Sequence, residues 1–349
     1  MTLTAARVVY VGSLRSGSTA LHRMRALQDA GAVVYPIDTA PECVRSLEKS
    51  IPMRIWHRAA GPVDLARANA RIHEAIARQA PDILWIDKGL TIAAATLRSV
   101  RDMCPNCIIV GYSPDDMTNP GNQSRRFIAG LPEYDVYFTT KTYGVAELEK
   151  LGVPHVHFIG NSYDPSTHQP LGPSEQQRAE LGGSVGFIGQ WEAHRSASLC
   201  QLAGAGVPVR VWGLDWHKCR CRSDFLRLEH RPLWGNDYAL ALCSFDINLC
   251  FLRKSNRDLQ TTRTMEIPAC GAFMLAERTD EHLALFEEGK EAEFFAGDAE
   301  LIDKAKYYIT HPARRRAIAE AGRLRCLRSG YSNQHRIAQM MQVITSLRH

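Results

Sequence analysis

The chain has 349 residues, which is long enough for about two domains with separate hydrophobic cores. Hydrophobic residues make up 45% and charged residues 23% of the sequence, a balance that excludes an intrinsically disordered chain. The 42 basic residues outnumber the 37 acidic ones only slightly, which suits a protein that binds anionic small molecules but does not predict a nucleic-acid partner.

Nothing in the sequence predicts a membrane-spanning or secretory segment. No apolar run approaches the ~18 residues of a membrane helix, and Gly12 and Arg15 interrupt the first apolar stretch too early for a signal peptide. We therefore expect a cytoplasmic protein and leave peripheral contact with a membrane open. The cysteines are expected to be structural thiols without a metal, because neither Cys104-Pro-Asn-Cys107 nor Cys219-Arg-Cys221 has the partners of a four-ligand site.

The first half of the chain alternates short apolar runs with helical patterns. Strands are predicted over residues 7–11, 33–35, 83–86, 107–110, 135–138 and 155–159. Apolar residues at helical spacing predict helices over residues 18–30 and 143–151, and a third helix that stops at Pro81. Because the strands are apolar throughout, we expect a parallel sheet covered on both faces.

The pattern breaks between residues 161 and 183, where prolines and the pair Gly182-Gly183 predict a linker over 166–183. Strands are predicted again over residues 184–188, 207–212, 246–251 and 272–275, and the chain is helical after residue 312. We therefore expect one domain over residues 1–165 and a second over 184–330. The helix over 331–349, with its apolar stripe, is expected to join the first domain.

Candidate ligand-binding residues follow the strands of the second half, because ligands of parallel sheets bind beyond the carboxyl ends of the strands. Gly189 and Gly213 each follow a strand, and Arg195 stands at the start of a helix. Arg253 and Lys254 follow the strand over residues 246–251. With Arg195 on one side and Arg253 or Lys254 on the other, such cations could neutralise a diphosphate.

A second helix start lies just beyond these cations. Thr261 or Thr262 at its beginning would leave backbone N–H groups for an anion, and Arg263 adds a further cation. Glu266 stands about one turn into the helix, where its carboxylate would line a solvent cleft and accept hydrogen bonds from a ribose diol. The alternative is a solvated, charged helix start with surface ion pairs.

Two loops of the first half are weaker candidates. Gly12, Ser13 and Arg15 follow the first strand but match neither the dinucleotide fingerprint nor the phosphate-binding P-loop, so we expect a tight turn that touches an acceptor or a diphosphate. Asp115 and Asp116 follow the strand near residue 110. Either one would bind an acceptor hydroxyl or act as its base, and the alternative is an Asp-rich turn.

Three stretches of the second half resemble the CgeB-like glycosyltransferases, whose C-terminal domain is similar to the glycosyl transferases of group 1. They are Gly186-Phe-Ile-Gly-Gln, Val211-Trp-Gly-Leu-Asp-Trp and Thr262-Arg-Thr-Met-Glu-Ile-Pro-Ala-Cys-Gly. The resemblance implies an α/β GT-B fold, with two facing Rossmann-like, doubly wound domains and a C-terminal helix that crosses back to the first. It also implies that the second domain binds a nucleotide-sugar.

The activity implied by the resemblance is that of a hexosyltransferase of class EC 2.4. It would move a sugar from a UDP-, GDP- or TDP-sugar to an unidentified acceptor, with retention and without a metal or other cofactor. In the Glu-x7-Glu motif of retaining GT-B enzymes Glu266 matches the second acid, which binds the donor ribose, whereas Asp258 replaces the first acid by a shorter one. Asp258 keeps a second interpretation open, a catalytically inactive GT-B protein that binds nucleotide or glycan.

Overall fold

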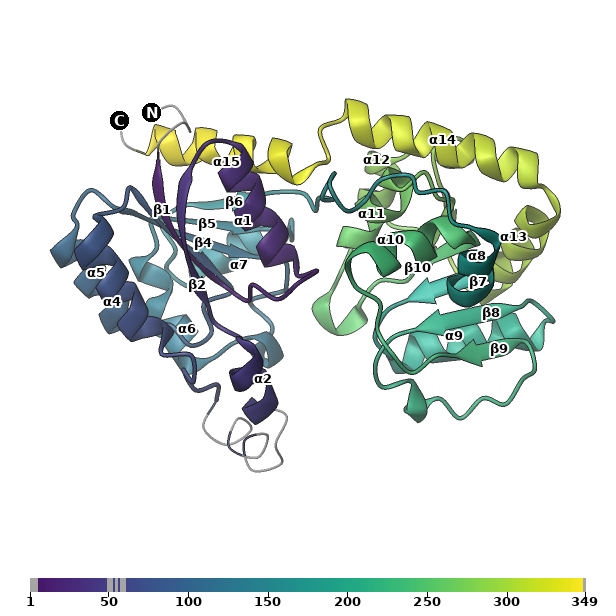
Figure 1. The fold of residues 1–349 in the computed structure, drawn as a ribbon, viewed down its shortest axis with the longest axis horizontal. Helices are drawn as coiled ribbons and strands as arrows, with labels where there is room; N and C mark the ends of the chain where they lie inside the picture. The colour runs from purple at the N-terminus through teal and green to yellow at the C-terminus, as the bar shows by residue number, and fades with distance from the viewer. Residues whose placement is uncertain (1–5, 49–52, 54–55, 57–60, 348–349) are drawn as a thin grey trace. The chain divides into compact units, whose positions relative to one another are not determined.

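The fold is seen in a computed structural model that describes residues 6–48, 53, 56 and 61–347. The chain divides into two compact units, of which unit 1 comprises Met1–Gly160 with Asn333–His349 and unit 2 comprises Asn161–Ser332. Each unit is built on a sheet of six parallel strands with helices packed against it (Figure 1).

The sheet of unit 1 has the strand order β2-β1-β3-β4-β5-β6, so the direction of winding reverses between β1 and β3. Its strands are β1 (Arg7–Gly12), β2 (Val33–Asp38), β3 (Ile83–Asp87), β4 (Ile108–Ser113), β5 (Val136–Thr139) and β6 (Val156–Phe158). Its helices are α1 (Thr19–Asp29), α2 (Glu42–Glu48), α4 (Ala68–Gln79), α5 (Ala94–Met103), α6 (Arg125–Gly130), α7 (Gly144–Lys150) and α15 (Asn333–Ser346), with short 3-10 turns η1 (Pro120–Asn122) and η2 (Leu131–Glu133).

Alternate residues of the central strands of unit 1 build two cores, one on each face of the sheet. On one face, residues such as Val9 and Ile109 pack with the apolar side chains of α4 and α5. On the other face the ring of Trp85 stacks near those of Tyr10, Tyr112 and Phe138, with centroid distances of 6.1, 6.3 and 6.3 Å. This alternation is the period-two side-chain pattern of strands that are buried on both faces.

The C-terminal helix α15 completes the second of these cores. Its buried side chains Ile337, Met340, Met341 and Ile344 pack in one cluster with residues of β1, β3 and α1. Figure 1 shows α15 alongside α1. The prediction that the C-terminal helix crosses back to the first domain is therefore confirmed.

The sheet of unit 2 has the strand order β12-β11-β10-β7-β8-β9, and its winding reverses between β7 and β10. Its strands are β7 (Gly183–Ile188), β8 (Val209–Trp212), β9 (Leu226–Leu228), β10 (Phe245–Cys250), β11 (Met274–Glu277) and β12 (Glu293–Phe295). Its helices are α8 (Glu175–Leu181), α9 (Ala193–Gly204), α10 (Gly235–Ser244), α11 (Thr262–Ala269), α12 (Asp280–Leu285), α13 (Asp298–Thr310) and α14 (Pro312–Arg328), with 3-10 turns η3 (Trp216–Lys218) and η4 (Lys254–Asn256).

The segment expected to be a linker, residues 166–183, contains helix α8. A capping box forms at its start, because Gln177 N donates to Ser174 Oγ at 3.2 Å and Ser174 N donates to Gln177 Oε1 at 2.8 Å. Leu181 at its end is buried in the core of unit 2. The helix is therefore a packed part of unit 2, and the irregular part of the segment is the stretch that precedes it.

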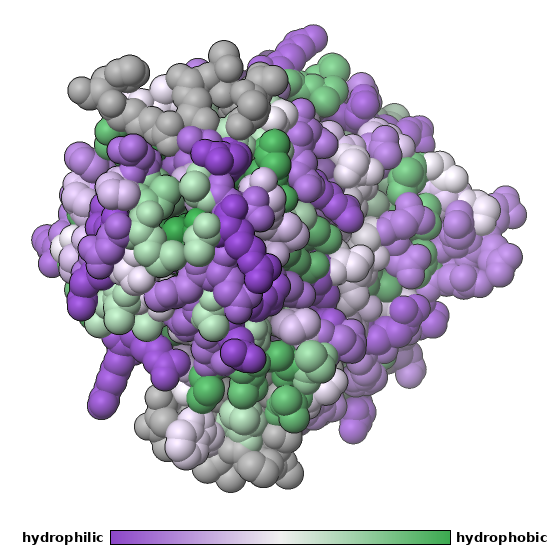
Figure 2. Space-filling view, turned by 60° about the vertical axis from the view of Figure 1, so that its left-hand side comes forward, coloured by the Kyte–Doolittle hydropathy of each residue, from purple (hydrophilic) through white to green (hydrophobic). Residues whose placement is uncertain are grey.

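Apolar side chains gather mainly inside these units. Hydrophilic residues cover most of the face drawn in Figure 2, with smaller apolar areas between them. Among the helices formed by described residues, none combines the length and the apolar character needed to span a bilayer. The two doubly wound parallel sheets confirm the predicted α/β fold class.

Candidate functional site

The topology of unit 2 brings the sequence-predicted donor residues to one edge of its sheet. Gly189 follows β7, Arg253 follows β10, and α11 begins beyond β10 at Thr262. Strands β7 and β10 are the neighbours between which the winding reverses, and the loops after such strands diverge and leave room for a ligand. The candidate site is therefore at the carboxyl ends of β7 and β10.

Two glycines let the loops after β7 and β8 approach each other. Gly213 has a φ of +155°, and a Cβ atom there would overlap the carbonyl oxygen of Gly189. The indole Nε1 of Trp216 donates to the same carbonyl at 2.8 Å. A Cβ atom on Gly189 would in turn lie 3.0 Å from Nη2 of Arg263. The backbone here is tight enough to require glycine at position 213.

Arg195, in the first turn of α9, is the most deeply buried cation of the site, with 3% of its surface exposed. Its Nη1 atom donates to the carbonyl of Gln190 at 3.1 Å and lies 3.6 Å from Glu192 Oε1. Its buried Nε atom has no hydrogen-bond partner among the described residues. Leaving a buried charged donor unpaired is costly, so this atom calls for an acceptor supplied by a ligand or water.

Other cations surround Arg195. Burial, and then the charges of Arg263 and Arg253, lower the pKa of Arg195 to about 10, although Glu192 and Asp258 act in the opposite direction. Arg263 is held in place because its Nε donates to the carbonyl of Ile188 at 2.8 Å. The net effect is an excess of positive charge that an anion would relieve.

The start of α11 adds backbone donors to these cations. Thr261 is the N-cap residue, and its backbone N donates to Thr264 Oγ1 at 3.1 Å. Thr262 and Arg263 are the first two helical residues, whose N–H groups have no acceptor within the helix. The structure thus places Thr261, Thr262 and Arg263 where a helix N-terminus attracts negative charge.

The residues after β10 form ion pairs and loop hydrogen bonds of their own. Lys254 Nζ lies 2.8 Å from Glu277 Oε2, and Arg253 Nε lies 3.0 Å from Glu192 Oε1. Asp258 Oδ1 accepts from Asn256 Nδ2 at 2.7 Å, and its Oδ2 accepts from the Arg253 backbone N at 3.3 Å. Asp258 therefore helps to shape the loop between β10 and α11. No sequence signal indicated the acidic partners, because they come from other elements.

Glu266 differs from the expectation that it lines a solvent cleft, since only 7% of it is exposed. The hydroxyl of Tyr238 donates to its Oε2 at 2.6 Å, and His168 Nε2 lies 3.8 Å from its Oε1. His168 Nδ1 accepts from the Asp164 backbone N at 3.0 Å, which leaves the ring proton on Nε2, facing Glu266. A proline-rich segment supplies His168, so spacing gave no hint of this contact.

In unit 1 the turn after β1 is built mainly from its own neighbours. Asp38 Oδ1 accepts from the Leu14 N at 3.0 Å, and the hydroxyl of Ser18, the N-cap of α1, donates to the Ser13 carbonyl at 2.8 Å. Burial, and then the charge of Arg45, lower the pKa of Arg15. Gly12 ends β1 and is followed directly by this tight turn, which is the arrangement expected from the sequence.

The two aspartates after β4 have different surroundings. Asp116 is buried, and its Oδ1 accepts from Thr118 Oγ1 at 2.8 Å, Thr118 N at 3.2 Å and Asn119 N at 3.2 Å. Asp115 forms an ion pair with Lys88. The geometry of Asp116 is that of an Asp-rich turn, the alternative left open by the sequence, and Asp115 is the more accessible of the two.

Sequence reasoning missed a buried ion pair in unit 1 where the winding of the sheet reverses. Arg23 Nη2 lies 2.8 Å from Asp87 Oδ1, and Tyr10 donates its hydroxyl to the same carboxylate. The guanidinium carbon of Arg23 lies 4.0 Å from the centre of the Tyr112 ring. Asp87 directly follows the apolar strand predicted over residues 83–86, and that position was the available signal.

The chain is similar to glycosyltransferases in part of its sequence and in its fold. Residues 195–342 match a family model described as glycosyl transferase-like. Sucrose-phosphate synthase from Thermosynechococcus elongatus has a similar structure, with a TM-score of 0.67 and 12% identity over 98% of this chain and 99% of that chain. Anabaena HepE in complex with UDP and glucose has a TM-score of 0.66 and 11% identity, over 98% and 100% of the two chains. No curated protein matches the chain in sequence.

A third similar structure is α,α-trehalose 6-phosphate synthase from Burkholderia multivorans, with a TM-score of 0.61 and 12% identity over 99% of both chains. The two parallel sheets and these similar structures show a GT-B fold, and the segment that matches the glycosyl transferase-like family model lies in the C-terminal half. TM-scores of 0.67 and 0.66 show a shared fold, and because the sequence identities are only 12% and 11%, the substrate has to be argued from the site.

Proposed function

We propose that the protein transfers a sugar from a nucleoside diphosphate sugar to an acceptor, and that unit 2 binds the diphosphate. The observation that carries this proposal is the buried guanidinium of Arg195, whose Nε has no partner among the described residues and which Arg263 and Arg253 surround with further positive charge. A diphosphate supplies both the missing acceptor and the missing negative charge.

In this proposal Arg195, Arg263 and the N–H groups that begin α11 bind the diphosphate. As the sugar–phosphate bond breaks, negative charge grows on the leaving diphosphate, and donors already aimed at that charge stabilise the transition state. The same cations supply the charge that a divalent metal would otherwise provide, which supports a metal-independent reaction. Arg253 and Lys254 lie at the surface on acidic partners and contribute positive charge at the rim.

Glu266 is proposed to accept hydrogen bonds from the donor ribose. Tyr238 donates to Oε2 and the His168 Nε2 proton faces Oε1, but each carboxylate oxygen has a second lone pair. Asp258 is proposed to face the transferred sugar, as the resemblance implies for a retaining enzyme. In unit 1, Asp115 and the turn after β1 are the proposed acceptor-side groups, whereas the hydrogen bonds of Asp116 favour a role in shaping the loop.

The similar structures suggest which donor to test first. Anabaena HepE is known in complexes with UDP and with UDP-glucose, so uridine is our first choice of base and glucose our first choice of sugar. We also propose that the chain belongs to the CgeB-like subgroup and that the transferred sugar is a hexose. All ten cysteines are free thiols, which supports a cytoplasmic, reducing location.

Release of UDP from UDP-glucose, with and without a pool of candidate acceptors, tests the proposal. We expect slow hydrolysis of UDP-glucose alone and faster release of UDP when an acceptor is present. The Asp258→Asn variant should have a lower turnover and an unchanged affinity for UDP. Binding of a diphosphate without release from any nucleotide-sugar would favour the second function, a nucleotide-binding protein without turnover. The hydrogen bonds that tie Asp258 into its loop are the observation in favour of that alternative. Failure of every nucleoside diphosphate to bind would overturn both.

A further inference from the structure

A fully buried histidine lies behind the start of α11, outside the residues that would touch a donor. We propose that His282 is a positioning residue, which fixes the N-terminus of α11 through Thr264 and so aligns the backbone donors of the anion site. This inference rests on the proposed function for its effect on ligand binding, and on hydrogen bonds alone for its structural part.

The hydrogen bonds around His282 allow one arrangement of protons. Its Nδ1 lies 2.6 Å from the carbonyl oxygen of Glu277, which can only accept, so Nδ1 carries the ring proton. Its Nε2 therefore accepts from Thr264 Oγ1 at 2.8 Å. That hydroxyl oxygen in turn accepts from the backbone N of Thr261 at 3.1 Å. The chain of donors leads from the N-cap of α11 to the carboxyl end of β11 without a break.

The surroundings of His282 hold the imidazole in the form that this chain needs. Burial lowers the pKa of His282 to about 4, so the ring is neutral at physiological pH. Its ring stacks on Phe294, with centroids 5.6 Å apart and an interplanar angle of 8°. Thr264 is fully buried as well, and Cys250 Sγ lies 3.9 Å from its hydroxyl. A histidine used only for packing would not need to orient a buried hydroxyl toward a helix cap.

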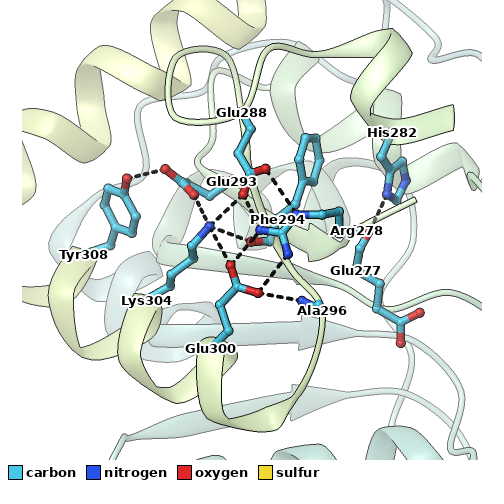
Figure 3. Close-up of polar contacts among 10 residues, drawn as sticks. All are labelled: Glu277, Arg278, His282, Glu288, Glu293, Phe294, Ala296, Glu300, Lys304 and Tyr308. Carbon is cyan, nitrogen blue, oxygen red and sulfur yellow. Dashed lines mark hydrogen bonds and ion pairs between the residues drawn. The ribbon is translucent and has the colours of Figure 1, made fainter. Parts of the chain in front are cut away.

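The segment that carries His282 also holds a surface cation of the site. Glu277 accepts from His282 through its carbonyl, and its carboxylate lies 2.8 Å from Lys254 Nζ. The next residue, Arg278, anchors the segment on its other side, as Figure 3 shows. Arg278 Nη1 donates to Glu300 at 2.8 Å and its Nε to Glu288 at 3.1 Å. Residues 277–282 thus connect a rigid polar cluster to both Lys254 and the start of α11.

The experiment removes each hydrogen bond while keeping shape. His282→Phe preserves the stacked ring, Thr264→Val preserves volume, and Thr264→Ser keeps the hydroxyl. We expect His282→Phe and Thr264→Val each to weaken UDP binding about tenfold in calorimetry, with uridine binding unchanged, because a lost cap typically costs about that factor. The double variant should also lose about tenfold, and Thr264→Ser should bind UDP like the wild type.

Several results would overturn the proposal. One is a roughly hundredfold loss of UDP affinity in the double variant, because that would mean that the two residues act independently. The others are equal losses of UDP and uridine affinity, and normal UDP binding by Thr264→Val. Hydrogen exchange of the Thr261 amide tests the structural link without a ligand, and we expect faster exchange in both single variants. Unchanged exchange would refute the link itself. If the wild type binds no diphosphate while exchange responds as expected, the proposed function has failed and the His282–Thr264 link stands.

Discussion

Replacing Arg195 by Met removes the buried guanidinium and keeps most of the length of the side chain. The expected loss follows from the contacts, because Arg195 offers an Nε donor without a partner among the described residues. The nearby acids also offset the charge of the surrounding cations only in part, since the pKa of Arg195 is lowered. A hydrogen bond to a charged group contributes about 1.5–3 kcal/mol, so UDP binding should weaken by about 2–3 kcal/mol, or about 30- to 150-fold. Uridine has no phosphate, and its affinity should be unchanged.

The unliganded protein should tolerate this substitution. Burial and the neighbouring cations lower the pKa of Arg195, which means that the folded protein disfavours its charge. The main loss is the hydrogen bond to the Gln190 carbonyl. The melting temperature of Arg195→Met should therefore fall by no more than about 3 °C.

Arg210 provides a matched control, since it is also a buried arginine of unit 2 but has its partners. Its Nε donates to Glu229 at 2.7 Å, and its Nη1 donates to the carbonyls of Ala179 at 2.9 Å and Gly182 at 3.0 Å. Arg210→Met should lower the melting temperature by about 8 °C or more, because it removes the ion pair with Glu229 and leaves the carbonyls of Ala179 and Gly182 without this donor. It should not change UDP affinity. Similar behaviour of the two variants, or an equal loss of UDP and uridine affinity in Arg195→Met, would contradict a role of Arg195 in binding the diphosphate.

Three other perturbations test separate parts of the account. Glu266→Gln should weaken UDP and uridine binding alike, by about 10- to 100-fold, because both ligands contain the ribose. An unchanged uridine affinity in calorimetry would show that the ribose binds elsewhere. Gly213→Ala should lower the melting temperature far more than Gly206→Ala, since both have positive φ but only the first Cβ would overlap a backbone atom, the Gly189 carbonyl oxygen. The pKa of His282 is about 4 in the folded protein and 6.5 ordinarily, so the unfolded chain binds more protons between these two pH values. The free energy of unfolding should therefore fall by about 3 kcal/mol as the pH is lowered from 6.5 to 4. Urea denaturation should show that His282→Phe lacks this part of the acid loss, and an identical acid loss in both proteins would contradict the assignment.

The central strands of both sheets were predictable because most are blocks of apolar residues bounded by turns, and β10 keeps apolar residues at alternate positions. The strands that sequence patterns did not reveal, β9 (Leu226–Leu228) and β12 (Glu293–Phe295), are three-residue edge strands that are too short to show a period. Helix α8 lies among prolines, and its visible signal was the capping pair Ser174 and Gln177. The local sequence pattern therefore identified the strands that are buried on both faces of a sheet. It missed the short edge strands and the helix that depend on tertiary packing.

The same division applies to the candidate site. The positions of Gly189, Arg195 and Thr262 relative to strands and helices were predictable, because chain order and parallel topology bring strand ends together. Which cation keeps a buried donor atom without a partner among the described residues was not predictable, since Lys254 and Arg253 meet their acids only in the folded unit. The burial of Glu266 likewise depends on Tyr238 and His168, which come from elements distant in sequence.

The most direct test of the central claim is a calorimetric titration of the wild type and Arg195→Met with UDP, GDP and TDP, each beside its nucleoside. We predict that one diphosphate binds the wild type with 1:1 stoichiometry and at least about 30-fold more tightly than its nucleoside. The Arg195→Met variant should lose that difference. Equal affinities for diphosphate and nucleoside in the wild type, or a preference that survives the loss of Arg195, would contradict a diphosphate site built on this guanidinium.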